Sequence, residues 1–147
     1  MGTTLIVACV LGDRLIACHV GDVRAYLRSS QGIEQITWDH TLVGALVQAG
    51  EITPDEARVH PEKNALLQAI GLPEGFVPGV NSRTLQDGDI VLLCSDGLWE
   101  ALSDQEINAI LMDQGSLADR AARLIQASNE SGGWDNISVA LYQHIGL

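Results

Sequence analysis

The stretch that decides the fold is Asp87-Gly-Asp-Ile-Val-Leu-Leu-Cys-Ser-Asp-Gly-Leu-Trp-Glu100. Residues Ile90–Cys94 form an unbroken apolar run between Gly88 and Gly97, and this pattern predicts a fully buried strand. Asp96 follows directly, where the chain leaves the core, and Gly97 allows another backbone to approach closely. Asp in this position is also common as a turn former or helix N-cap, so this stretch alone assigns Asp96 no function.

A second stretch, Ser131-Gly-Gly-Trp-Asp-Asn-Ile-Ser-Val-Ala-Leu-Tyr142, places Asp135 at the entering end of another strand. If the two strands pair antiparallel, Asp96 and Asp135 lie at the same sheet edge. Neighbouring carboxylates raise each other's pKa unless a cation lies between them. A hard divalent metal ion, which prefers oxygen ligands, is the natural solution.

Composition narrows the class of protein. The chain has 147 residues, 46% of them apolar, and this predicts one domain over residues 1–147 with its own core. The net charge of −11 favours neither nucleic acid nor an anionic membrane as a partner. We interpret Cys9, Cys18 and Cys94 as buried, reduced thiols and expect a cytoplasmic protein. No signal peptide or membrane-spanning run is expected.

The spacing of apolar and turn residues predicts an α+β fold. Strands are expected over 3–10, 15–20, 23–28 and 33–37 as an antiparallel meander, and again over 77–85, 90–94 and 136–142. Capping boxes at Thr53 and Ser103 predict helices, the second reaching about Met112. A further helix is expected over 117–128, paired with the second across one sheet face.

Residues 39–71 differ from the strands around them. Helical spacing begins at Leu42, Gly50 is a plausible C-cap, and a last helical turn or two is expected over 64–70. We interpret this polar segment as an inserted flap that moves beside the site as a lid.

Several segments resemble the PPM-type metal-dependent protein phosphatases, the protein phosphatase 2C family, in its bacterial branch. The resemblance covers nearly the whole chain in the family's order. The matching segments are His19-Val-Gly-Asp-Val-Arg-Ala-Tyr26, Asp39-His-Thr-Leu42, Gly50-Glu-Ile-Thr-Pro-Asp-Glu-Ala57, His60-Pro61, Leu93-Cys-Ser-Asp-Gly-Leu98 and Gly132-Gly-Trp-Asp-Asn-Ile-Ser-Val139.

The resemblance implies an α-β-β-α fold, in which an antiparallel β-sandwich is flanked by helix layers. It implies hydrolysis of phosphoserine and phosphothreonine on proteins in bacterial signalling, by water activated at two Mn²⁺ or Mg²⁺ ions. By the same resemblance, Asp96 and Asp135 are metal ligands, and Asp22 with Asp96 holds a third, weaker ion. The supporting residues implied are Gly21, Gly97 and Asn136 around the ligands, and Asp39, His40, Thr41 and His60 in the flap.

Departures from the family pattern leave alternatives open. The family's Asp-Gly-Met-Gly-Gly segment, whose carboxylate bridges both metals, has no counterpart here, and neither do the upstream acidic ligand and phosphate-binding Arg. We therefore expect a domain truncated at its N-terminus that is inactive alone and self-associates through an exposed N-terminal strand edge. The alternatives are a non-catalytic regulatory or protein-binding remnant of the fold and a β-protein stabilised by structural Ca²⁺.

Overall fold

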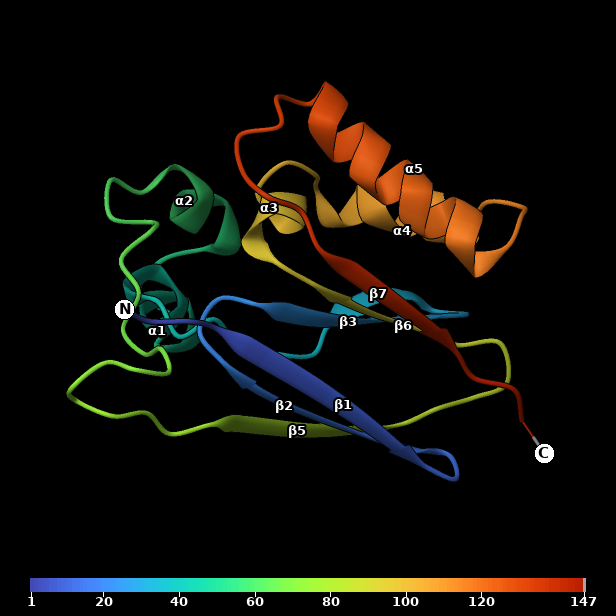
Figure 1. Cartoon of the computed structure of the whole chain (residues 1–147), viewed down its shortest axis with the longest axis horizontal. Helices are drawn as coiled ribbons and strands as arrows, with labels where there is room; N and C mark the ends of the chain where they lie inside the picture. Colours follow the sequence, from blue (N-terminus) through green and yellow to red (C-terminus); the bar gives the residue numbers. More distant parts are fainter. Residues whose placement is uncertain (147) are drawn as a thin grey trace.

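Two antiparallel sheets packed face to face form the body of the computed structural model, which describes residues 1–146 (Figure 1). The three-stranded sheet has the order β1-β2-β5, with bounds Leu5–Leu11, Arg14–Val20 and Gly79–Thr84. The four-stranded sheet has the order β4-β3-β6-β7, with bounds Gly32–Gln35, Arg24–Ser29, Ile90–Cys94 and Val139–Gln143. The α+β class and the antiparallel sandwich are confirmed.

The connection between β2 and β3 corrects one expectation from the sequence. The β1–β2 hairpin is present, but β2 pairs with β5 and β3 pairs with β6, so the first four strands are not one meander. The turn at Gly21 carries the chain from one sheet to the other, with a φ of 100° that favours glycine. Local patterns identify strands but not their partners, which is why the sequence could not show this change of sheet.

Three helices cover the outer face of the four-stranded sheet: α3 (Asp96–Trp99), α4 (Asp104–Met112) and α5 (Leu117–Glu130) (Figure 1). Leu92 of β6 packs with Ile107 of α4 and Leu124 of α5 in one buried cluster. The predicted capping box at Ser103 is present, and Ser116 with Asp119 forms another that the sequence reasoning missed. The predicted helix pair over one sheet face is therefore confirmed.

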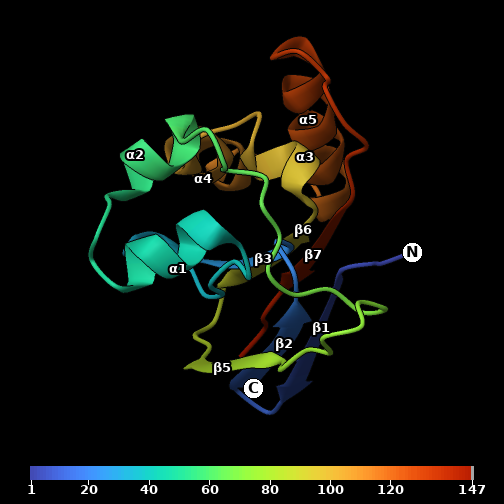
Figure 2. The same cartoon turned by 90° about the vertical axis from the view of Figure 1, so that its left-hand side faces the viewer.

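The predicted flap contains α1 (Leu42–Gln48) and α2 (Pro54–Val59), side by side at one end of the sandwich (Figures 1 and 2). The prediction of helical turns over residues 64–70 is wrong. Backbone groups there bond to other segments instead: Leu67 N donates to His40 O, and Ile70 N donates to Thr3 O. Contacts distant in sequence thus override local helical spacing.

The outer face of the three-stranded sheet is apolar and exposed. Val7 of β1 and Val80 of β5 are 53% and 65% exposed, and Leu5 and Leu11 lie on the same strand as Val7. Cys9 is exposed, because alternate residues of β1 point outward, and Cys18 is half-buried. The expectation of three buried thiols therefore holds only for Cys94. All three cysteines are free, as expected. Within residues 1–146, no helix has the length and apolar character needed to cross a membrane.

Candidate functional site

Asp96 lies just after the end of the buried strand β6. β6 ends at Cys94, Ser95 occupies the N-cap position of the short helix α3 without a side-chain capping hydrogen bond, and Asp96 is the first residue of that helix. The Asp96 carboxylate accepts a hydrogen bond from Gly97 N at 2.9 Å and remains partly exposed. Its pKa is raised, first by burial and then by the negative charge of Asp135. The strand and the turn together thus hold a carboxylate at the rim of the core.

Asp135 lies in the loop that leads into β7. Because β6 and β7 pair antiparallel, with Cys94 opposite Val139, the end of one strand and the start of the other meet at one sheet edge. Ser138 N donates to Ser95 Oγ at 3.0 Å, which ties the loop to the turn before Asp96. The predicted juxtaposition of Asp96 and Asp135 is therefore present in the fold.

Gly97 and Asn136 make a close backbone contact at this edge. A Cβ at Gly97 would lie 2.4 Å from the carbonyl oxygen of Asn136, so only glycine fits without displacing the loop. The close approach that the sequence predicted for Gly97 is present. Asn136 contributes its backbone to this contact, and its side chain is exposed.

Asp22 reaches the same edge from the turn between β2 and β3. Its pKa is raised to about 6, first by burial and then by Asp96, with smaller effects from Asp39 and Glu100. Its backbone carbonyl accepts a hydrogen bond from the indole Nε1 of Trp99 at 2.9 Å. The fold thus brings Asp22 beside Asp96, and Asp96 beside Asp135.

The chemistry of these donors fits a hard divalent cation such as Mn²⁺ or Mg²⁺, because all three are carboxylates whose mutual repulsion a cation would relieve. Their geometry supports only part of a metal centre. Within residues 1–146, no group of three or more His, Cys, Asp or Glu side chains is arranged closely enough to hold a metal ion. The described chain therefore offers neighbouring pairs of carboxylates rather than a complete ligand set.

The flap residues singled out from the sequence each make different contacts in the structure. Thr41 is the N-cap of α1, accepting a hydrogen bond from Gly44 N at 3.0 Å. His40 accepts one from Gly21 N through Nδ1, and its pKa is lowered by burial and by nearby His19. His60 is the C-cap of α2, and its Nδ1 accepts a hydrogen bond from Glu62 N at 3.1 Å.

Asp39 and Arg24 form a buried ion pair that the sequence reasoning missed. Arg24 Nε and Nη2 donate to the Asp39 carboxylate at 2.9 and 2.6 Å, and its guanidinium stacks 3.6 Å from the centroid of the Trp99 ring. This arrangement raises the pKa of Arg24 further, although burial opposes it. No local signal in the sequence joins residues 24, 39 and 99, which are far apart along the chain.

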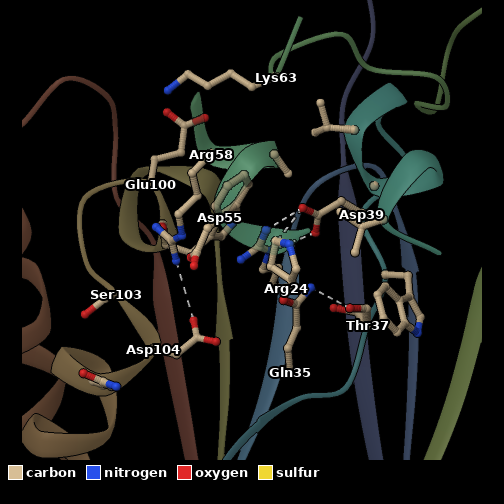
Figure 3. A pocket seen from close by; sticks show the side chains of 18 residues that line it. Arg24, Gln35, Thr37, Asp39, Asp55, Arg58, Lys63, Glu100, Ser103 and Asp104 are labelled. Atoms are coloured by element: carbon tan, nitrogen blue, oxygen red, sulfur yellow. Dashed lines mark hydrogen bonds and ion pairs between the residues drawn. The ribbon is translucent and has the colours of Figure 1, made fainter. Parts of the chain in front are cut away.

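A pocket of about 540 Å³ adjoins this ion pair, between the flap helices and the start of α4 (Figure 3). Arg24 and Asp39 lie in its wall, and Asp104 forms an ion pair with Arg58 of α2 at 3.8 Å. Arg58 also donates to the carbonyl of Trp99, so the flap contacts the helix that carries Asp96. Trp99 lines the pocket and belongs to the same helix as Asp96, whereas Asp22, Asp96 and Asp135 are not among the lining residues.

Comparisons with known proteins identify relatives of this chain. A family model described as Stage II sporulation protein E (SpoIIE) matches residues 39–142, and one described as Protein phosphatase 2C matches residues 1–43. Protein phosphatase PhpP of Streptococcus pneumoniae is 42% identical over 141 residues, which are 96% of this chain and 57% of that protein. The chain therefore spans little more than half the length of this relative.

Solved structures show the same fold. Serine/threonine phosphatase Stp1 from Staphylococcus aureus superposes with a TM-score of 0.92 at 36% identity, over 99% of this chain and 57% of that one. The catalytic domain of the phosphatase PstP, solved in complex with 2 manganese ions, gives a TM-score of 0.84 at 38% identity, over 99% and 60% of the two chains.

Proposed function

This chain belongs to the protein phosphatase 2C, or PPM, family, and from that premise we propose that it supplies part of a metal-dependent centre for hydrolysing phosphoserine and phosphothreonine in proteins. The observation that carries the proposal is the run of neighbouring carboxylates Asp22, Asp96 and Asp135 at one sheet edge. Burial and then repulsion from a neighbouring carboxylate raise the pKa values of Asp22 and Asp96, and a bound cation would relieve the repulsion.

The chain's own groups favour attack by water over attack by a protein nucleophile. Cys94 is the cysteine nearest to Asp96 in sequence, but burial raises the pKa of its thiol to about 12. A thiol with that pKa is not a nucleophile at neutral pH. The carboxylates of Asp96 and Asp135 would hold Mn²⁺ or Mg²⁺, with Asp22 beside them at a further, weaker position. The bound ions would lower the pKa of a water molecule and neutralise charge on the phosphoryl oxygens.

The proposed metal binding can be measured without turnover. Calorimetric titration of the 147-residue chain with Mn²⁺ should show weak binding that Asp135→Asn reduces about 10-fold or more. Asp13→Asn, which changes an exposed Asp in the β1–β2 turn, serves as the matched control and should bind like the unchanged chain. Equal Mn²⁺ affinity of Asp135→Asn and Asp13→Asn would remove Asp135 from the site.

We further propose that this chain alone does not turn over phosphate esters. The reason is the ligand set: two cations held close together need a shared carboxylate, and residues 1–146 provide no cluster of three ligands. Hydrolysis of p-nitrophenyl phosphate and of a phosphothreonine peptide with Mn²⁺ should be absent for the chain. It should appear when the chain is joined to the part of PhpP that it does not span. Turnover by the monomeric chain alone that Asp96→Asn abolishes would refute this.

A cytoplasmic location and phosphorylated proteins as substrates belong to the same proposal. The three free cysteines support the location, because disulfides are rare in the reducing cytosol. The naming of relatives as protein phosphatases supports the substrate class. The non-catalytic alternative is favoured for the isolated chain only, on the ground of its incomplete ligand set.

A further inference from the structure

We propose that Arg24 is a positioning residue. It holds the turn between β2 and β3, which carries Asp22, against residues 38–40 at the base of the flap. The effect of this positioning on cation binding rests on the proposed function, whereas the contact between the turn and the flap does not. Arg24 begins β3, two residues after Asp22. Its side chain is 13% exposed and that of its partner Asp39 is 7% exposed, so this pair is largely screened from water.

The Arg24 guanidinium has protein partners on each of its nitrogens. Nε donates to both oxygens of Asp39 at 2.9 and 3.2 Å, and Nη2 donates to Oδ2 at 2.6 Å. Nη1 donates to the hydroxyl of Tyr26 at 3.0 Å. Only the planar fork of arginine makes this set of bonds, because the ammonium of lysine is a single point of charge. Arg24 is thus specified by shape as well as by charge.

Trp99 connects this pair to Asp22. The guanidinium lies over the face of the indole ring, and the edge of the same ring donates from Nε1 to the backbone carbonyl of Asp22 at 2.9 Å. Arg24 therefore helps to fix the plane of the ring, and the ring fixes the backbone that carries the Asp22 carboxylate.

A second set of bonds joins the base of the flap to the same turn. His40 N donates to Gly21 O at 3.0 Å, and Gly21 N donates to His40 Nδ1 at 3.3 Å. The ring of His19 bonds through Nε2 to the carbonyl of Trp38 at 2.7 Å. Residues 38–40 and 19–22 are consequently held together on both sides of the Asp39 carboxylate that Arg24 binds.

Two conservative variants separate positioning from general stability. Arg24→Lys keeps the charge and loses the fork, while Trp99→Phe keeps an aromatic face and loses the N–H group. Arg83→Lys is the matched control, because Arg83 forms a similar but exposed pair with Glu34 on another strand. Each 147-residue variant is titrated with Mn²⁺, and its hydrogen exchange is measured without metal at the amides of Gly21 and His40.

Arg24→Lys and Trp99→Phe should each weaken Mn²⁺ binding at the position beside Asp22 about 10- to 100-fold. They should speed exchange at Gly21 and His40 while Ile90–Cys94 stays protected, and Arg83→Lys should change neither property. Unchanged affinity and exchange in a folded Arg24→Lys would overturn the proposal, as would exchange that rises equally in Ile90–Cys94. If the unchanged chain binds no Mn²⁺, the proposed function fails and exchange alone decides the positioning role. If Arg24→Lys does not fold, Trp99→Phe decides it.

Discussion

Gly21 shows how one residue without a side chain sets the position of the Asp22 turn. It has a φ of 100°, and a Cβ there would lie 2.3 Å from Thr4 Cγ2. Gly32 has a φ of 118° but open space around it, which makes it a matched control. Gly32→Ala should cost about 1 kcal/mol of unfolding free energy for the backbone alone. Gly21→Ala should cost a further ~1–3 kcal/mol because of the overlap with Thr4. Urea denaturation measures both costs, and equal losses would show that Thr4 moves aside freely.

Asp22 makes the metal-free chain sensitive to pH. Its folded pKa is raised from 3.8 to about 6, so between these values the folded chain keeps a proton that the unfolded chain has lost. The resulting stabilisation is present below the lower value and is lost as the pH rises through the higher one. In EDTA, unfolding free energy should therefore fall between these pH values, and Asp22→Asn should flatten that fall whereas Asp13→Asn should not. Identical pH profiles for the two variants would contradict this assignment.

The flap is the element in which motion is expected. Its two helices are short, α2 buries no residue, and α2 contacts the body through the exposed side chain of Arg58. Elements with few buried contacts open at low free-energy cost. Hydrogen exchange should therefore be faster over α2 than in Ile90–Cys94, which lies in the core. The base of the flap at His40 should exchange more slowly than α2, since it bonds to Gly21. Uniform protection of α2 and β6 would rule out a lid.

For the whole molecule, the exposed sheet edge predicts self-association. Within residues 1–146, β1 pairs only with β2, and its outward side chains are apolar. An unpaired apolar edge invites pairing with another chain. Sedimentation velocity should show association that grows with concentration and that Val7→Lys reduces. Val59→Lys changes an equally apolar, 82% exposed residue on α2 and should leave association unchanged. A monomer at every concentration tested, or an equal effect of both variants, would contradict association through β1.

Helix starts and the buried strand could be predicted from the sequence because their causes are local. The capping boxes at Thr53 and Ser103 need only residues three apart, and Ile90–Cys94 needs only an apolar run between glycines. The juxtaposition of Asp96 and Asp135 was also predictable, since it required only that two strands pair antiparallel.

Tertiary structure alone decided which strands share a sheet, that residues 64–70 bond across the chain instead of forming helical turns, and that Arg24 meets Asp39 and Trp99. The physical reason is how far apart in the sequence the interacting residues lie. Caps and apolar runs act over a few residues, whereas strand partners and buried ion pairs join residues far apart in the sequence, which meet only when the chain folds.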